Sequence, residues 1–491
     1  MIRSALHGPS RRVLPALVLL AASCAASGDA AGQDLAFPVL GADAPAGTGV
    51  VQPCTAPGLV GPARCGAFRV WEDREGRRGR TIDLAFVVLG ATDAAARADD
   101  AVILLPGGPG QDFTGGAVPI SRGFRNLRRT RDILLVDVRG VGRSQALDCA
   151  VPYPGGFRSR FGTVFPPAHA AACRDSLGRR ANLTLYTTAS SVDDLDELRS
   201  WLGYPSLNLM GGSYGTRAAQ VYMRRHPSAV RTVVLNGVAP IAEPLYVQHA
   251  RLLQRTLDRL IAECQADQEC GRAHPEFAAH VDAVLERFRR GPVEVELEGE
   301  HVPFALGDLA YALRGLLYGR AAELPGLVAR AAAGDVQPLA EYYVERTAWV
   351  GEAGGSAGYH FSVLCAVDIA PLTEEDVARA TAGTFMGAHL IDGYRTVCDL
   401  WPYARLPASH WTPVQSDAPT LLLSGSLDPV TPPEGAEAVA AHLANALHVV
   451  VPGGGHGVGG PCLERMVTTL IETASLDALD LTCVPRADDG G

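Results

Sequence analysis

The chain has 491 residues and a formal net charge of -10, and 47% of its residues are hydrophobic while 20% are charged, a balance typical of a globular protein. All 43 of its basic Lys-or-Arg positions are arginine, which excludes Schiff-base enzymes, Ser-Lys dyads and Walker-type phosphate sites, since each needs a lysine amine. The acidic balance also argues against a phosphate-backbone binder, so nucleic acid is not expected as a partner.

Residues 1–23 have the order of an export signal. Arginines precede a short apolar run over 13–22 that is too brief to cross a bilayer as a helix. Small residues then lead to Cys24, which resembles a bacterial lipoprotein signal with Cys24 as the acylated residue. Signal cleavage a few residues later, without a lipid, is the alternative. We expect an exported protein, periplasmic or extracellular, whose only membrane contact is a possible lipid anchor at Cys24.

The next segments predict a flexible tether followed by an α/β core. Residues 24–60 are rich in Gly, Ala and Pro and are expected to form the tether. From 61 to 240, short apolar segments alternate with helical patterns, which predicts a mostly parallel sheet with helices on both faces. Strands are expected at 82–89, 101–105, 132–138, 207–210 and 232–236, and helices at 191–202 and 214–226, the first of them opened by a capping box at 191–194.

Residues 241–410 break this alternation. Helical patterns dominate there, which predicts a helical cap inserted over the sheet. The expected cap helices are 245–264, 276–289, 307–318, 323–333 and 338–350, with one strand-like segment at 293–297. The core resumes in 411–491, with strands at 420–424 and 448–451, a helix near 433–444 and a closing helix over 462–476.

The cysteines fit an oxidising compartment. Eleven cysteines less Cys24 leave ten, an even number that allows five bridges. Neighbours in the chain predict the pairs Cys54 with Cys65, Cys149 with Cys173, Cys264 with Cys270, Cys365 with Cys398, and Cys462 with Cys483. A zinc site is the weaker alternative, because the close Cys or His spacing that structural zinc needs is missing. No metal or other cofactor is expected.

The segment Gly211-Gly212-Ser213-Tyr214-Gly215 fits the pattern GxSxG. It lies between an expected strand and an expected helix, where a tight turn would project the Ser213 hydroxyl above the sheet as a nucleophile. An incidental serine in an ordinary strand-to-helix turn is the alternative.

A serine hydroxyl needs a histidine base, and that base needs a carboxylate to hold its tautomer. Asp428 follows the strand at 420–424, and His456 stands in a glycine-rich loop after the strand at 448–451, so both are expected at the carboxyl edge of the sheet. The order Ser, acid, His is the one expected for this sheet architecture. Asp399 and His410 are the rival acid and base, but neither follows a sheet strand.

The tetrahedral intermediate needs backbone amides that donate to its oxyanion. The amide of Tyr214, directly after the nucleophile, is one expected donor. Gly108 is the other, because the loop Leu105-Pro106-Gly107-Gly108-Pro109-Gly110 follows an early strand and its backbone can approach a substrate closely. An ordinary Pro/Gly turn is the alternative for this loop.

These motifs, together with Asp137-Val-Arg139-Gly140-Val-Gly142-Arg-Ser144 and Cys398-Asp-Leu-Trp401-Pro402, resemble one family. From about residue 80 to 485 the chain is similar to the α/β-hydrolase serine exopeptidases of the proline iminopeptidase and tripeptidyl aminopeptidase group, with a tripeptidyl-aminopeptidase-like carboxyl-terminal region. The resemblance implies the triad Ser213, Asp428 and His456 under a helical cap. Pro106 departs from the histidine usual before Gly-Gly-Pro-Gly in proline iminopeptidases, which weakens strict proline specificity.

Exopeptidase action on amino termini also needs a carboxylate that meets the substrate's free ammonium. Asp368 is the first candidate and Glu243 the second, and solvated surface acids are the alternative for both. Asp137 and Arg139 are expected to form a buried ion pair that braces their glycine turn rather than to take part in catalysis.

The sequence thus predicts an exported serine hydrolase that releases short units from peptide amino termini through an acyl-enzyme on Ser213. Its expected partners are short peptides or other small acyl substrates. A carboxylesterase or other small-acyl hydrolase with the same triad is the second hypothesis, since one nucleophile supports many leaving groups. A non-catalytic binding protein on a hydrolase fold is the third, and it predicts a missing triad member.

Overall fold

The computed structural model describes residues 35–347 and 356–484. The export signal, Cys24 and the end of the helix expected at 338–350 lie outside these ranges. None of the helices within them combines the length and the apolar character needed to cross a lipid bilayer.

A nine-stranded sheet with strand order β1-β2-β3-β5-β4-β6-β7-β10-β11 forms the core. Strands β1 to β3 pair antiparallel and β3 pairs antiparallel with β5, while the neighbours from β5 to β11 are parallel. The bounds are β1 Gly49–Pro53, β2 Ala63–Asp73, β3 Arg78–Leu89, β4 Ala101–Leu105, β5 Asp132–Val136, β6 Leu207–Gly212, β7 Val230–Asn236, β10 Thr420–Gly425 and β11 Ala446–Val451. The predicted mostly parallel sheet is confirmed.

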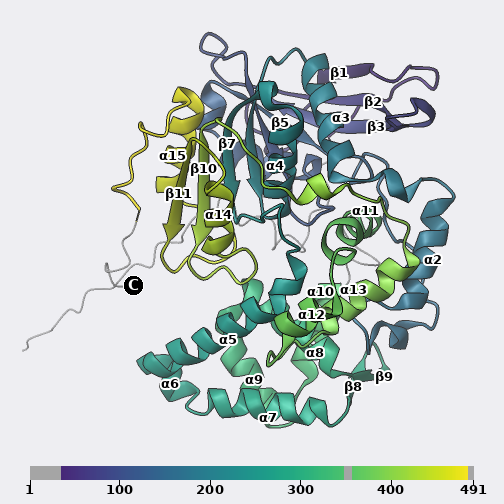
Figure 1. Cartoon of the computed structure of the whole chain (residues 1–491), viewed down its shortest axis with the longest axis vertical. Helices are drawn as coiled ribbons and strands as arrows, with labels where there is room; N and C mark the ends of the chain where they lie inside the picture. Colours follow the sequence, from purple (N-terminus) through teal and green to yellow (C-terminus); the bar gives the residue numbers. More distant parts are fainter. Residues whose placement is uncertain (1–34, 348–355, 485–491) are drawn as a thin grey trace, which may run out of the picture.

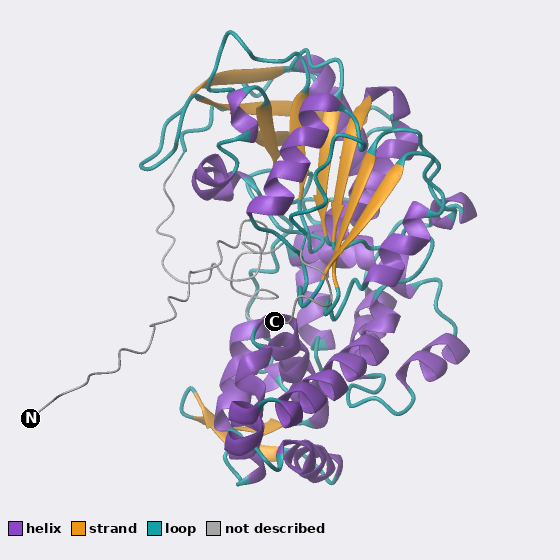
Figure 2. Cartoon of the chain, turned by 90° about the vertical axis from the view of Figure 1, so that its left-hand side faces the viewer, coloured by secondary structure: helices purple, strands orange, loops and turns teal. Residues whose placement is uncertain are grey.

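Two apolar cores cover the two faces of this sheet. Ile103 and Leu105 of β4 belong to one core, and Val102 and Leu104 belong to the other, so every second side chain points to the same face. On the first face pack α2 Pro167–Gly178, α3 Thr188–Trp201, α4 Tyr214–Arg225 and α14 Pro433–Ala440; on the second pack α1 Ala117–Gly123 and α15 Pro461–Thr473. Figure 2 shows the strands between helices on both sides.

A helical insertion follows β7 and lies beyond the carboxyl ends of the parallel strands (Figure 1). It contains α5 His249–Ala266, α6 Gln268–Ala273, α7 Phe277–Arg289, α8 Leu306–Gly319, α9 Leu324–Ala332, α10 Gln337–Thr347, α11 Ala357–Leu364, a π-helical turn Cys365–Ile369, α12 Glu374–Thr381 and α13 His389–Leu400. The hairpin of β8 Val293–Leu297 and β9 Glu300–Phe304 lies at its far end. Because catalytic groups of such sheets collect at strand carboxyl ends, the insertion is placed to cover a site there.

Several elements differ from the expectations: strand β2 and helices α11, α12 and α13 were not expected, and three further differences have a local cause. Strand β1 lies inside the segment 24–60 that was expected to be a flexible tether. It forms because its backbone pairs with β2, and β2 itself gave no clear strand signal, since its apolar residues do not alternate. Strand β9 was not expected either, since Pro303 interrupts its pattern. Helix α3 begins at Thr188 and is capped by Thr187, whose hydroxyl accepts the Ser190 amide at 3.0 Å, rather than starting at the capping box expected from 191 to 194.

Five disulfides join the cysteines in the pairs expected from chain order: Cys54–Cys65, Cys149–Cys173, Cys264–Cys270, Cys365–Cys398 and Cys462–Cys483. The bridge between Cys365 and Cys398 ties the π-helical turn to α13 within the cap. The bridge between Cys462 and Cys483 ties the segment after α15 back to that helix. Bridges of this number are typical of proteins that fold in an oxidising compartment.

The turn after β5 is braced by two separate clusters, not by an ion pair between Asp137 and Arg139. Asp137 is fully buried and accepts the amides of Phe113, Thr114 and Arg143 at 2.9 to 3.0 Å. Burial raises the pKa of Asp137, and these hydrogen bonds oppose the shift. Arg139 instead donates to both carboxylate oxygens of Asp194 on α3, at 2.7 and 2.8 Å. Bracing was predicted correctly, but the partner was wrong because Asp194 is distant in sequence.

Replacing Arg139 by methionine should therefore lower the free energy of unfolding by about 3 kcal/mol, since the buried Asp194 carboxylate loses its bidentate partner and keeps only the partly exposed Arg74. Urea unfolding followed by circular dichroism measures the loss. Arg330→Met is the matched control, because the pair of Arg330 with Asp335 is about half exposed and should cost less than about 1 kcal/mol. Equal losses in the two variants would contradict the bracing role.

Candidate active site

Ser213 lies in a strained turn between β6 and α4. Its backbone has φ 52° and ψ -122°, a combination rarely adopted outside glycine and typical of a nucleophile elbow. A side chain at Gly211 would collide with the backbone of Gly215, and one at Gly215 would collide with the Leu105 carbonyl of β4. The two glycines are thus required for the turn to pack against the sheet, and the turn presents Ser213 at the carboxyl edge.

His456 and Asp428 form a hydrogen-bonded pair at the ends of β11 and β10. Nδ1 of His456 lies 2.8 and 3.0 Å from the two carboxylate oxygens of Asp428. Oδ1 of Asp428 also accepts the amides of Val430 and Thr431, and the Thr431 hydroxyl donates to its Oδ2 at 2.7 Å. These contacts hold the carboxylate so that it fixes the orientation of the imidazole, leaving Nε2 for chemistry.

The pKa of Asp428 reflects this arrangement. Burial alone would raise it, but the charge and hydrogen bond of His456 and the hydrogen bonds from Thr431 outweigh burial and hold the pKa of Asp428 below its ordinary value. The carboxylate is therefore ionised at neutral pH, as an orienting group must be.

The end of β7 connects Ser213 with the pair of His456 and Asp428. The Ser213 amide donates to the carbonyl of Asn236, the last residue of β7, at 3.0 Å. A Cβ on the next residue, Gly237, would lie 3.3 Å from Cε1 of His456 and 3.5 Å from Oδ2 of Asp428. The nucleophile and the base thus flank the same two-residue turn. Sequence reasoning missed Gly237, because an Asn-Gly pair after a strand is usually an ordinary turn.

Within the described residues, the Ser213 hydroxyl makes no hydrogen bond to His456. The histidine-acid half of the expected relay is formed, and the serine-histidine half is not. Catalytic hydrogen bonds commonly tighten only when substrate binds. The complete relay therefore stays a prediction.

One expected oxyanion donor, Tyr214, directly follows Ser213, and the loop that carries the other, Gly108, lies beside it. A Cβ on Gly107 would lie 3.5 Å from the Cβ of Ser213, which places the glycine loop after β4 beside the nucleophile. Gly108 has φ 106°, in the region that favours glycine, and its carbonyl accepts the Tyr246 hydroxyl at 3.3 Å. Among the described residues neither the Gly108 amide nor the Tyr214 amide at the start of α4 has an acceptor, so both remain available to a ligand.

The two carboxylates expected at the substrate's ammonium have other partners. Asp368 is 3% exposed, and its oxygens accept from Nη1 of Arg217 at 2.9 and 3.0 Å and from the Leu245 amide at 2.7 Å. A fixed ion pair of this kind has little net charge to offer a substrate, so its contacts favour a structural role over the expected one. Glu243 is exposed and accepts from Gln248 at 2.7 Å, at the rim of an outer groove of about 560 Å³.

The rival acid and base are not assembled. Asp399 is exposed on α13, whereas burial, with smaller effects from two arginines, lowers the pKa of His410 to about 4. No hydrogen bond joins the two side chains in the described part of the chain.

Cap side chains, which carried no motif in the sequence, border the His456 loop. The ring of Tyr318 on α8 lies 4.7 Å from the His456 ring, and Tyr246 next to α5 contacts the Gly108 carbonyl. The sequence offered only the aromatic and histidine content of the cap as a signal for these residues. That signal is weak, because tyrosines on helices are more often core residues.

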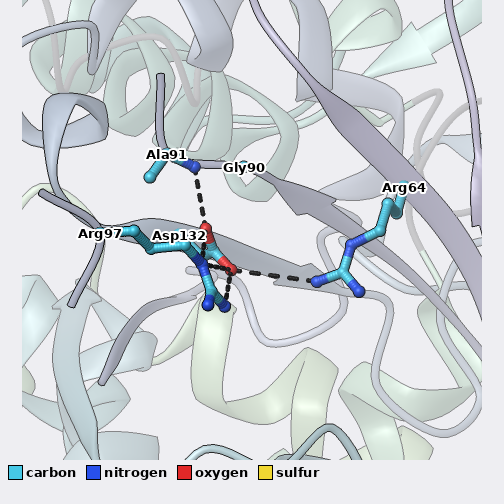
Figure 3. A pocket seen from close by; sticks show the side chains of 5 residues that line it. All are labelled: Arg64, Gly90, Ala91, Arg97 and Asp132. Carbon is cyan, nitrogen blue, oxygen red and sulfur yellow. Dashed lines mark hydrogen bonds and ion pairs between the residues drawn. The ribbon is translucent and has the colours of Figure 1, made fainter. Parts of the chain in front are cut away.

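A small pocket of about 290 Å³ lies at the opposite edge of the sheet (Figure 3). Its floor is Asp132, the first residue of β5, which accepts from Arg97 at 2.7 Å and from the Ala91 amide at 2.8 Å, with Arg64 at 3.9 Å. Because β5 starts here, the pocket is remote from the strand ends that carry Ser213 and His456. The Asp132 carboxylate in it is already paired with Arg97.

Comparisons with known proteins agree with this geometry. A family model described as alpha/beta hydrolase fold matches residues 100–278, and one described as TAP-like protein matches residues 380–483. A tripeptidyl aminopeptidase of Streptomyces coelicolor is 26% identical over 468 residues, covering 87% of this chain and 84% of the relative. A serine protease of Mycobacterium bovis is 25% identical, covering 84% and 86%. A proline iminopeptidase of Neisseria gonorrhoeae is 31% identical over 137 residues, 28% of this chain and 32% of the relative.

The first match spans β4 to the start of the cap, including the Gly108 loop and the Ser213 elbow. The second spans the last cap helices and the segments that bear Asp428 and His456. Both halves of the site therefore fall inside regions similar to proteins of these two families, and the chain is a hydrolase with the α/β-hydrolase fold and a carboxyl-terminal region that resembles TAP-like proteins.

Proposed function

We propose that this chain is an exported serine exopeptidase that releases short units from the amino termini of peptides. The observation that carries the proposal is the strained Ser213 elbow beside the pair of His456 with the buried Asp428, at one edge of the sheet and under a helical cap. The peptidase names of its relatives support a peptide as substrate. The five disulfides support export.

In the proposed mechanism, Oγ of Ser213 attacks the scissile carbonyl while Nε2 of His456 takes the hydroxyl proton. The amides of Gly108 and Tyr214 donate to the oxyanion of the tetrahedral intermediate. His456 then passes the proton to the leaving amine, and the acyl group stays on Ser213. Water, deprotonated by the same imidazole, attacks the ester; His456 then returns the proton to Oγ of Ser213 as the acyl bond breaks and the amino-terminal fragment leaves. Asp428 stays ionised and holds the imidazole throughout.

The cap supports an exopeptidase rather than an endopeptidase. Tyr246, in the turn before α5, contacts the oxyanion loop, and Tyr318 of α8 lies against His456. A cap over the catalytic edge of the sheet favours a short or flexible peptide end as the substrate. Lipid attachment at Cys24 lies outside the described residues and remains a prediction.

The test is a panel of matched substrates assayed by mass spectrometry: peptides with free amino termini, the same peptides acetylated, and simple acyl esters. We expect the free peptides to release amino-terminal fragments of constant length. Their acetylated forms should react at least about 100-fold more slowly, because acetylation removes the free ammonium that an exopeptidase recognises. Turnover of esters with none of the peptides would instead favour the carboxylesterase hypothesis.

A further inference from the structure

Arg314 is a cation inside the cap that pairs with no carboxylate in the described part of the chain. It stands on α8, and its Nε is buried without a hydrogen-bond partner. Among the described residues its guanidinium forms no ion pair and no hydrogen bond. Two other arginines of the interior, Arg139 and Arg217, are each paired with a buried aspartate. Since a desolvated guanidinium is unfavourable unless an acceptor meets it, Arg314 is the kind of residue a ligand would complete.

A second unpartnered polar side chain lies in the same cluster. His249, the first residue of α5, is 3% exposed, and neither ring nitrogen has a hydrogen-bond partner among the described residues. Burial, together with the positive charge of Arg314 and the neighbouring His456, lowers the pKa of His249 well below its ordinary value. The ring is therefore neutral at pH 7 and has one N–H to donate. Its neighbour Tyr246 lies 4.8 Å away, ring to ring.

The cluster borders the reaction centre. The Arg314 guanidinium lies 5.9 Å from the ring centre of Tyr318, and that ring lies 4.7 Å from the ring of His456. On the other side, Tyr246 donates to the carbonyl of Gly108 in the oxyanion loop. Helices α5 and α8 both lie below the strand ends in Figure 1. A ligand that reaches Arg314 is therefore within a few residues' length of Ser213.

Two carboxylates near this cluster, Asp368 and Asp428, already have partners of their own. Asp368, whose negative charge adds to the effect of burial in raising the pKa of Tyr246, is paired with Arg217. Asp428 is paired with His456. The walls are aromatic: Tyr311 and Tyr318 face the guanidinium at 5.6 and 5.9 Å. Cation–π contacts fix the plane of the guanidinium but leave its N–H groups free for an acceptor.

We propose that Arg314 and His249 form a subsite that binds a carboxylate of the peptide substrate. This rests on the proposed peptidase function and adds a preference to it. A guanidinium fork matches a carboxylate in charge and geometry, and a neutral imidazole N–H supplies a further hydrogen bond. The carboxylate is either the carboxyl terminus of a short peptide or an acidic side chain. Both present the same chemistry to Arg314.

The experiment compares four versions of one short peptide that the enzyme cleaves: free carboxyl terminus or carboxamide, each with Glu or Gln near the carboxyl end. We expect kcat/KM to be at least about 10-fold higher for the form with the bound carboxylate, mainly through KM. A preference for the free terminus over the carboxamide identifies the terminal carboxylate. A preference for Glu over Gln in both terminal forms identifies the side chain. Equal kcat/KM for all four overturns the proposal.

Arg314→Gln should reduce that preference to within about 2-fold, since the charge is lost. Arg320→Gln is the matched control, because Arg320 follows the same helix but is paired with Glu323 on the surface, and it should keep the full preference. Arg314→Lys retains the charge and should keep part of the preference, and the thermal midpoint of each variant reports its folding. Preserved discrimination in a folded Arg314→Gln protein would refute the subsite.

Binding gives a readout independent of turnover. In a Ser213→Ala background, calorimetry should show a Kd at least about 10-fold lower for the preferred acid than for its neutral twin, and Arg314→Gln should remove the difference. The two proposals fail separately. An enzyme that cleaves no peptide defeats the peptidase proposal, whereas one that cleaves all four forms equally defeats only the carboxylate subsite.

Discussion

Replacing Ser213 by alanine is expected to lower kcat by about 10⁶ on every substrate that the chain hydrolyses, since loss of the nucleophile removes the acyl-enzyme route. The elbow should persist, because its geometry depends on Gly211 and Gly215 and on packing against β4 rather than on the hydroxyl. The variant should therefore unfold at the same temperature as the native chain within a few degrees. Steady-state kinetics and a thermal melt measure the two quantities.

Fluorophosphonate labelling provides the control for this prediction. The reagent should modify Ser213 in the native chain and leave the Ser213→Ala protein unlabelled, as read by peptide mass spectrometry. Ser409→Ala is the matched substitution, because Ser409 is exposed in a surface turn outside the site, and it should leave labelling and turnover intact. Labelling of another serine in the Ser213→Ala protein, with turnover retained, would show that the nucleophile is not Ser213.

Replacing Asp428 by asparagine should lower kcat by about 10⁴ while leaving KM nearly unchanged. The amide keeps the shape of the carboxylate and can still accept the amides of Val430 and Thr431. It no longer stabilises the imidazolium that forms at His456, and it favours the wrong tautomer of the ring. Pre-steady-state kinetics should place the loss in acylation and deacylation. Retention of activity within about 10-fold would show that another group orients His456.

The lowered pKa of Asp428 also predicts that the stability difference between the native chain and this variant depends on pH. Because the folded chain holds the pKa of Asp428 below its unfolded value of about 3.9, the ionised carboxylate stabilises the fold at pH values above about 4. That contribution is lost as the pH falls through the lower, folded value. The difference in free energy of unfolding between native and Asp428→Asn proteins should therefore be present at pH 7 and shrink towards pH 2. Urea unfolding at the two pH values measures it.

Much of the core was predictable because its signals are local. The runs at 101–105 and 207–210 are short, apolar and bounded by turn residues, and they appear as buried strands of one parallel sheet. The catalytic candidates stand one to five residues after such strands, so their common edge follows from the topology alone. Strands β1 and β2 are different, since antiparallel pairing at the sheet margin stabilises segments whose own pattern is weak.

Ion-pair partners were predicted less well than positions. Arg139 was placed in a braced turn correctly, but its carboxylate lies 55 residues further along the chain, on α3. Asp368 was expected to face a substrate, and its carboxylate instead meets Arg217 of α4. A charge in a sequence has many possible partners, and only burial and the approach of distant helices select one.

The amino-acid sequence by itself determined the alternation of strands and helices in the parallel part of the core, the elbow at Ser213 and the loops that carry Asp428 and His456, because each depends on hydrophobic periodicity and glycine within a few residues. Tertiary structure alone decided which charges are neutralised and which are left open, as it did for Asp368 and Arg314. The reason is physical: whether a buried charge has a partner depends on desolvation and on groups brought together from remote parts of the chain.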